Sequence, residues 1–209
     1  MCRWHKAKKE YLETLEREIE IGKVDRDIIP LLKKINSLDE YYTTSSCSGR
    51  IQITAAKLPG DKFNLITLAK WHRVVDVKEV LRVIEASSEE DIWFGVQPPI
   101  LHVVCKDLTS AERLLELARN NGFKHSGIQG LNPERVVLEI TSTERIETPL
   151  RLNGIDFFDK GRLELLVKVG NELLVKGKMR LARLEMRVSS LNLSKISYVR
   201  RNGSNTGST

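Results

Sequence analysis

The residues best suited to chemistry stand together at positions 43–51, which read Thr-Thr-Ser-Ser-Cys-Ser-Gly-Arg-Ile. Six hydroxyl or thiol side chains in a row precede a glycine and an arginine. Small polar side chains bond to nearby backbone and favour turns, and Gly49 permits a positive φ. Arg50 adds a fixed fork of donors that suits a carboxylate or a phosphate. We therefore expect a polar loop that presents hydroxyls, backbone N–H groups and a guanidinium to an anionic ligand.

An aromatic plane, a titratable ring and a guanidinium follow one another at Trp71, His72 and Arg73. Nucleobases stack on Trp and bond to such donors, so this trio suits a base-binding pocket. A partly buried Trp that packs on the core explains Trp71 equally well from the sequence alone.

A second polar loop with glycines is expected over residues 122–130, which include Ser126 and Gly127. This loop follows a helical pattern rather than opening a helix after a strand, so the dinucleotide-binding fingerprint does not apply. A Walker phosphate loop is also absent from the sequence. Any nucleotide-like cofactor must therefore be held by some other loop.

His102 and Cys105 have an H-x-x-C spacing that could suggest a metal site. A strand is expected over residues 100–105, and side chains three apart on a strand point to opposite faces. The two side chains therefore cannot chelate one ion, and we expect no metal site.

The three cysteines are widely spaced and form no disulfide framework, which suits free thiols in a reducing cytosol. Cys47 could act as a nucleophile, although no glycine elbow accompanies it, and Cys105 is typical of a small apolar core residue.

No apolar run approaches the roughly 20 residues needed to cross a membrane. The charged start of the chain does not resemble a signal peptide. We expect a cytoplasmic protein that spans no membrane.

Positive charge is concentrated in the last quarter of the chain. Residues 151–209 carry twelve Lys or Arg side chains against five Asp or Glu, whereas the whole chain has a formal net charge of +6. A clustered basic surface is typical of a nucleic-acid partner, because neutralised phosphates release counterions. At about 100° per residue, four basic side chains of a helix expected over residues 161–191 share a narrow arc. They are Lys176, Arg180, Arg183 and Arg187. A solvated charged face is the plainer explanation.

The elements that position these residues alternate between helices and short, hairpin-like strands. Apolar spacing predicts further helices over residues 5–21, from about 25, over 77–86 and over 107–120. Strands are predicted over 51–54, 92–96, 100–105, 135–141 and 146–152. We expect an α+β fold with a mixed, mostly antiparallel sheet packed with helices, not a classical Rossmann fold. A single domain over residues 1–201 and a flexible tail over 202–209 complete the prediction.

Several of these segments, in order, resemble one family, that of tRNA wybutosine-synthesizing protein 3 and its archaeal members. The resemblance covers most of residues 5–190, and the Ser-Cys-Ser-Gly-Arg-Ile segment is its most specific part. The other segments are 59–62, 70–73, 98–103, 122–124 and 126–128, followed by the strand and extension over 136–150 and the long helix. Gln97 stands where an acidic residue is expected, which argues against a general base there, and His125 replaces another expected basic residue.

The resemblance implies an S-adenosylmethionine-dependent methyltransferase. Its substrate would be the 7-aminocarboxypropyl-demethylwyosine base at position 37 of tRNA(Phe), methylated on N4 during wybutosine biosynthesis. Methyl transfer from a sulfonium is an in-line displacement, so alignment and desolvation matter more than strong acid–base chemistry. A base need only remove the proton lost from the nitrogen, directly or through water.

We assign site roles on this hypothesis. His72 or His102 orients the target nitrogen or accepts its proton. The methyl donor, or the polar arm of the substrate, contacts the two polar loops through Ser45, Ser46, Ser48, Gly49, Arg50, Ser126 and Gly127. The tRNA anticodon stem-loop contacts Trp71, Arg73, Lys176, Arg180, Arg183 and Arg187. Protein partners are unknown.

Two other functions use the same features. A non-catalytic tRNA-binding module could present the modified anticodon loop to a partner enzyme, using the basic helix and no methyl donor. An acyl or thiol enzyme would depend on Cys47 and should lose all activity with Cys47→Ser.

Overall fold

The computed structural model describes residues 3–61, 63–132 and 134–191 of the 209-residue chain. Its internal contacts divide the chain into two compact units. Unit 1 comprises Met1–Ser46, Leu101–Thr141 and Arg180–Thr209, and unit 2 comprises Cys47–Ile100 and Ser142–Met179. The single domain over residues 1–201 stays a prediction, and the predicted tail over 202–209 lies outside the described residues.

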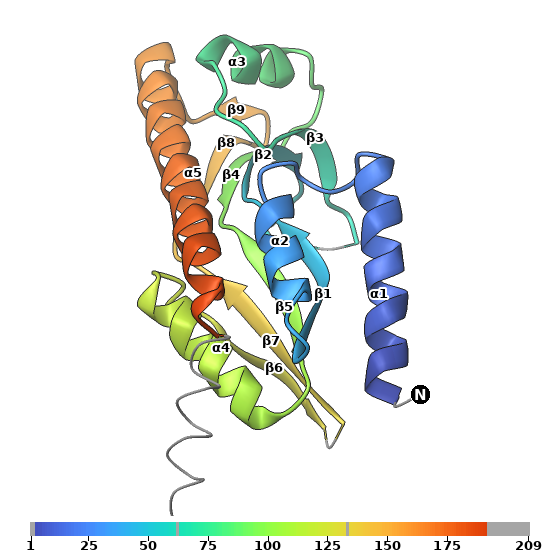
Figure 1. Ribbon diagram of the computed structural model, residues 1–209. Helices are drawn as coiled ribbons and strands as arrows, with labels where there is room; N and C mark the ends of the chain where they lie inside the picture. The colour runs from blue at the N-terminus through green and yellow to red at the C-terminus, as the bar shows by residue number, and fades with distance from the viewer. Residues whose placement is uncertain (1–2, 62, 133, 192–209) are drawn as a thin grey trace, which may run out of the picture. The chain divides into compact units, whose positions relative to one another are not determined.

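Unit 1 is built on a four-stranded sheet with the order β1-β5-β7-β6 (Figure 1). Its strands are β1 (Tyr41–Cys47), β5 (Ile100–Cys105), β6 (Gly127–Asn132) and β7 (Arg135–Thr141). The β6 and β7 strands are antiparallel, and their register places Gly127 opposite Glu139. Side chains that alternate along these strands are divided between two cores, one on each face of the sheet.

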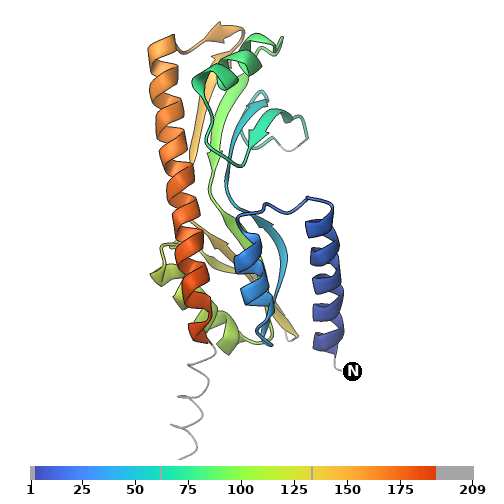
Figure 2. The same ribbon diagram turned by 45° about the horizontal axis from the view of Figure 1, so that its top comes forward.

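The larger core of unit 1 lies between the sheet and helices α2 (Ile29–Asn36), α4 (Leu108–Asn120) and the last turns of α5 (Lys160–Val188). Its fully or nearly fully buried side chains include Ile35, Leu101, Val103, Leu114, Leu138 and Leu184. On the other face, Trp4 of α1 (Arg3–Glu20) packs with Tyr42 and Val104. The α1 helix runs beside β1, the edge strand of this sheet (Figure 2).

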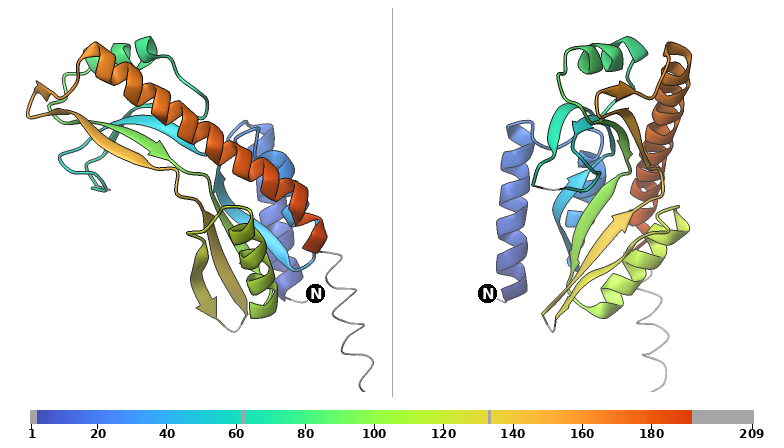
Figure 3. Two further views of the ribbon diagram at one scale, coloured as in Figure 1. Left: turned by 90° about the vertical axis from the view of Figure 1, so that its left-hand side faces the viewer. Right: turned by 180° about the vertical axis from the view of Figure 1, so that it is seen from behind.

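Unit 2 is built on a five-stranded sheet with the order β3-β2-β4-β8-β9. Its strands are β2 (Arg50–Ala55), β3 (Ile66–Trp71), β4 (Ile92–Gln97), β8 (Ile146–Leu152) and β9 (Ile155–Asp156), and all the neighbouring pairs are antiparallel. Helix α3 (Val77–Glu85) and the first part of α5 cover one face of this sheet (Figure 3). Their buried side chains, among them Val80, Ile84, Leu163 and Val167, meet Ile53, Phe94 and Leu150.

The α+β class with antiparallel pairing is confirmed, although the expected sheet is divided into two. Three local expectations were wrong. The supposed loop 43–51 is mostly strand, because β1 continues to Cys47 and β2 starts at Arg50. Residues 127–130 of the second supposed loop belong to β6 (Gly127–Asn132), which pairs with β7. The second helix starts at Ile29 rather than near residue 25, so Pro30 lies in its first turn.

Within the described residues, no helix is both long enough and apolar enough to cross a membrane.

Candidate functional site

A hydroxyl-lined groove lies between α1 and β1 in unit 1. Its volume is about 260 Å³. One side of the groove is lined by four β1 residues, Thr43, Thr44, Ser45 and Ser46. The other side is lined by α1 and the loop that follows it, through Tyr11, Thr14, Leu15, Glu18, Lys23 and Val24. The groove therefore offers hydroxyl donors and acceptors, one carboxylate and one ammonium. That set of groups matches the amino acid end of a ligand.

Ser45 begins a row of polar contacts that crosses the unit 1 sheet. The Oγ atom of Ser45 lies 2.6 Å from Nδ1 of His102 on β5. The Nε2 atom of the same ring lies 3.1 Å from Oε2 of Glu139 on β7. The side chains of His102 and Glu139 are 30% and 25% exposed, so the row is partly shielded but open to a ligand. These three side chains come from three strands that are neighbours in the sheet.

Gly127, on the fourth strand of the sheet, lies next to the end of this row. It faces Glu139 across the β6–β7 pair, and a Cβ added there would meet no atom within 4 Å. Directly opposed residues place their side chains on the same face of a sheet. The missing side chain of Gly127 therefore leaves open space beside Glu139. Unit 1 thus brings together Ser45, His102 and Gly127, which the sequence analysis proposed from three separate segments.

Ser126 is engaged in holding the end of α4 to the sheet. Its buried Oγ donates to the carbonyl oxygen of Phe123 at 2.7 Å and accepts from the backbone N–H of Thr141 at 3.1 Å. Its predicted contact with a ligand stays a prediction, and the contacts seen here are structural.

Glu139 is the residue that sequence reasoning missed. It lies in a strand whose other side chains include Val136, Val137, Leu138 and Ile140. A carboxylate in such an apolar strand is unusual, since an isolated charge on a half-buried strand needs a partner. That signal could have identified Glu139 without the structure.

The Ser48–Gly49 turn between β1 and β2 belongs to unit 2 and packs tightly there. Gly49 has a φ of +90°, and a Cβ added to it would lie 3.2 Å from the carbonyl oxygen of Gln97 and 3.3 Å from Pro99. The Nζ atom of Lys178 on α5 donates to the fully buried hydroxyl of Ser48 at 3.1 Å. The turn is therefore shaped by its neighbours, and only glycine fits position 49 without strain.

Cys47, Arg50 and His72 lie close together in unit 2. The Sγ atom of Cys47 lies 3.8 Å from Nδ1 of His72 and 3.8 Å from Nη1 of Arg50. Arg50 also donates from Nε to Oε1 of Gln52 at 2.8 Å, which orients its guanidinium. His72 and His102, the two candidate bases, therefore belong to different units.

Trp71 and Arg73 both have partners inside unit 2. Trp71 is half-buried against the core of this unit, as the packing alternative proposed. Arg73 donates from Nη2 and Nη1 to the two carboxylate oxygens of Glu79, at 2.6 and 3.1 Å. Contact between Arg73 and RNA would have to compete with this ion pair.

The four basic residues of α5 differ in their surroundings. Lys176 lies 3.8 Å from Oε1 of Glu144 in unit 2. In unit 1, Arg180 donates from Nη1 to the carbonyl oxygen of Gly122 at 2.8 Å, so it holds the turn after α4. Arg183 and Arg187 are exposed. These two guanidinium groups are the members of the set best placed to meet phosphates.

His102 and Cys105 point to opposite faces of β5, as their spacing predicts. Cys105 lies in the larger core with Leu101 and Val103, whereas Val104, two residues from His102, belongs to the core on the other face. Burial, with a smaller contribution from the charge of Asp107, raises the pKa of the Cys105 thiol to about 12.

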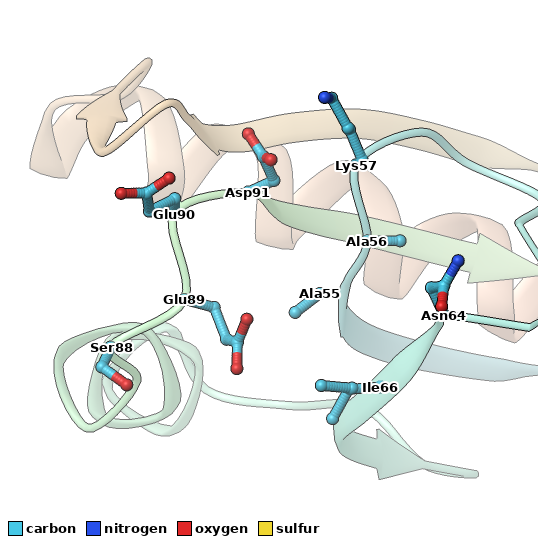
Figure 4. Close-up of a pocket in the computed structure, with 9 residues that line it drawn as sticks. All are labelled: Ala55, Ala56, Lys57, Asn64, Ile66, Ser88, Glu89, Glu90 and Asp91. Carbon is cyan, nitrogen blue, oxygen red and sulfur yellow. The ribbon is translucent and has the colours of Figure 1, made fainter.

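A second cavity, of about 300 Å³, lies in unit 2. Figure 4 shows its lining, with the side chain of Glu89 pointing into it towards Ala55 and Ile66. Glu90 and Asp91 also line this cavity, and Lys57 is its one cationic side chain. Three carboxylates repel a polyanion, so the cavity does not suit an RNA backbone.

Comparisons with known proteins give one consistent result. The family model described as Methyltransferase TYW3 matches residues 6–190. A Pyrococcus horikoshii protein named tRNA(Phe) 7-((3-amino-3-carboxypropyl)-4-demethylwyosine(37)-N(4))-methyltransferase 1 is 44% identical over 90% of this chain and 96% of its own. A protein of the same name from Pyrococcus furiosus is 46% identical over the same shares.

Two solved structures extend the comparison to the fold. The PH1069 protein from Pyrococcus horikoshii matches with a TM-score of 0.84 and 44% identity, over 88% of this chain and 95% of that one. A hypothetical protein from Aeropyrum pernix matches with a TM-score of 0.73 and 31% identity, over 80% of this chain and 98% of that one.

Proposed function

Because the chain belongs to the TYW3 methyltransferase family, we propose that it methylates N4 of the 7-(3-amino-3-carboxypropyl)-4-demethylwyosine base at position 37 of tRNA(Phe). The family predicted from the quoted motifs is confirmed. The similarity spans nearly the full length of the named relatives, so it is not limited to a shared binding segment.

S-adenosyl-L-methionine is the methyl donor that we propose, and it supplies an electrophilic methyl group on a sulfonium. The unit 1 groove supports this choice. Glu18 can hold an ammonium, while Lys23 and the hydroxyls of Thr43 to Ser46 can hold a carboxylate. An amino acid carries both charges on one carbon. The residues present therefore fit the amino acid end of the donor.

The aminocarboxypropyl arm of the proposed base has the same two charges. We assign the groove to the donor, with Ser45 and Ser46 as contacts. The contacts of Ser48, Gly49 and Arg50 with the donor or with the polar arm of the substrate stay predictions from the sequence. A binding experiment can distinguish the two ligands, because one is part of the tRNA and the other is free in solution.

The row formed by Ser45, His102 and Glu139 is the structural observation that carries the proposal. Loss of a proton from the methylated nitrogen requires an acceptor, and a neutral imidazole is suited to this near pH 7. His102 has one ring nitrogen directed at a hydroxyl that lines the groove. We propose His102 as this acceptor, and His72 as a residue that orients the substrate.

Arg183 and Arg187 support contact with the anticodon stem-loop, because both guanidinium groups are exposed. We include Lys176, Arg180, Trp71 and Arg73 in the proposed RNA contacts. The reaction on tRNA and the free thiols suggest a cytoplasmic location. A non-catalytic module is not favoured, because the named relatives are methyltransferases.

Calorimetry with S-adenosyl-L-methionine tests the enzyme against the module. We expect one donor site, weakened by Glu18→Gln and by Lys23→Met. Glu13→Gln, on an exposed part of α1, is the matched control and should leave the affinity unchanged. If Glu18→Gln and Lys23→Met instead keep their affinity for the donor and lose affinity for tRNA(Phe), the groove binds the aminocarboxypropyl arm of the substrate. No donor binding, with or without tRNA(Phe), would contradict the enzyme.

A further inference from the structure

We propose that Glu139 is a positioning residue that fixes the tautomer of His102, so that this ring receives the substrate proton through the hydroxyl of Ser45. The inference rests on the proposed methyl transfer and adds to it a residue and a route for the proton.

The hydrogen-bonding capacities of the three groups determine the tautomer. An ionised carboxylate can only accept, so the 3.1 Å contact with Glu139 requires the proton of a neutral His102 ring to be on Nε2. Nδ1 then has a lone pair, and its 2.6 Å neighbour Ser45 must donate its hydroxyl proton to it. Glu139 thus directs the basic nitrogen of His102 towards Ser45.

The sheet makes this alignment rigid. Ser45, His102 and Glu139 lie on β1, β5 and β7, which are consecutive neighbours in the sheet. Side chains on strands are held more accurately than side chains on loops. Gly127 lies opposite Glu139 and adds no side chain, so no side chain at this position displaces the carboxylate.

The hydroxyl of Ser45 connects the ring to the groove. Ser45 is exposed, and it lines the groove together with Thr43, Thr44 and Ser46. In the proposed complex the target base lies next to the donor at this hydroxyl, so that its nitrogen can pass a proton to Oγ while the Oγ proton moves to Nδ1. His102 need not touch the ligand itself.

Every proton in the proposed methyl-transfer step can be accounted for. The ligand nitrogen gains a methyl group and loses its hydrogen, and the sulfonium donor leaves as a neutral thioether. Ser45 accepts one proton and gives one, so it ends unchanged. His102 becomes an imidazolium, which is stabilised by the Glu139 carboxylate on its other nitrogen. The ring then returns its proton to solvent.

Glu139→Gln is the variant that separates positioning from simple packing, because it keeps the shape and removes the charge. An amide can donate as well as accept, so the ring can also adopt the tautomer with its proton on Nδ1. Long-range ¹H–¹⁵N correlation spectra of the full-length protein report the tautomer of His102 directly. We expect the Nε2–H tautomer in the wild-type protein and in Glu134→Gln, and a mixture of tautomers in Glu139→Gln. Glu134 is a suitable control because its carboxylate pairs with Arg3 instead.

The rate of methyl transfer should change together with the tautomer of His102. We expect kcat for methyl transfer to fall by about 100-fold in Glu139→Gln, with KM for tRNA and donor changed less than about twofold. Glu139→Asp, which keeps an obligatory acceptor, should recover part of the rate and the Nε2–H tautomer. Ser45→Ala should lower kcat with the tautomer unchanged.

Two results would overturn the inference. One is an unchanged His102 tautomer in Glu139→Gln, and the other is an unchanged kcat in a Glu139→Gln protein that folds normally. The spectra need no tRNA, so a wrong substrate assignment would leave them intact. Failure of the proposed function therefore looks different from failure of this inference.

Discussion

Lys178 donates a hydrogen bond from Nζ to the hydroxyl of Ser48, which is fully buried in unit 2. Ser48 starts the turn that leads to Arg50, so this contact ties the proposed donor-binding turn to α5. A hydrogen bond from a charged donor compensates part of the cost of burying this hydroxyl.

Lys178→Met tests this contact, because the methionine retains most of the apolar stem. We expect the free energy of unfolding to fall by about 1–3 kcal/mol, as for other hydrogen bonds that involve a charged group. Lys168→Met, at an exposed position of the same helix, is the control and should change it little. Urea titration gives both values, and equal effects would rule out a specific role for Lys178.

Gly49→Ala should destabilise the protein for two reasons that a second variant can separate. The left-handed φ of +90° strains any side chain, and the new Cβ would crowd the carbonyl oxygen of Gln97 at 3.2 Å. Gly154 also has a positive φ, but a Cβ there would meet no atom within 4 Å. We expect a loss of about 1–3 kcal/mol for Gly49→Ala and a smaller loss for Gly154→Ala. Equal losses in urea titrations would show that crowding contributes nothing.

The two cysteines that the structure describes should react differently with iodoacetamide. The thiolate is the reactive form, and burial raises the pKa of Cys105 to about 12, so this residue should stay unmodified at pH 8. Cys47 is half-buried and should react faster. Peptide mass spectrometry after a short exposure measures both.

Cys47→Ser should retain methyl transfer, and complete loss of activity in that variant would support a thiol enzyme.

Glu79 should make stability depend on pH. The hydrogen bonds from Arg73 and from the backbone of Asp76 lower the pKa of Glu79 to about 2, from an ordinary value of 4.5. Because the folded pKa is the lower one, this stabilisation is present above pH 4.5 and is lost as the pH falls towards 2. Glu79→Gln should therefore lower Tm at pH 7, and the difference from wild type should shrink across that window. A difference in Tm between wild type and Glu79→Gln that stays constant from pH 7 to pH 2 would contradict the lowered pKa of Glu79. Glu85→Gln on the same helix serves as the control.

The strands built from β-branched residues could be predicted with their bounds. Residues 100–105, 135–141 and 146–152 were identified as strands, and the structure places β5, β7 and β8 there. Their apolar residues alternate or run continuously, so local sequence and tertiary packing agree.

The hydroxyl-rich strand could not be predicted in the same way. Ser and Thr favour turns locally, but β1 is held by pairing with β5, from a segment more than 50 residues later in the chain. The same applies to β6, whose glycines suggest a loop until its pairing with β7 is known. Non-local pairing also explains why Glu139 was missed, since its contact with His102 joins two strands separated by α4.

The most direct test of the whole account is a methyl-transfer assay with tRNA(Phe) from cells that lack this modification. The protein is incubated with labelled S-adenosyl-L-methionine, and the tRNA is then digested to nucleosides. We expect the label on N4 of the position-37 base. His102→Ala should lower the rate by about 100-fold, while His5→Ala, at an exposed position near the start of α1, should not. Label on any other nucleoside, or no label with the wild-type protein, would contradict the proposed function.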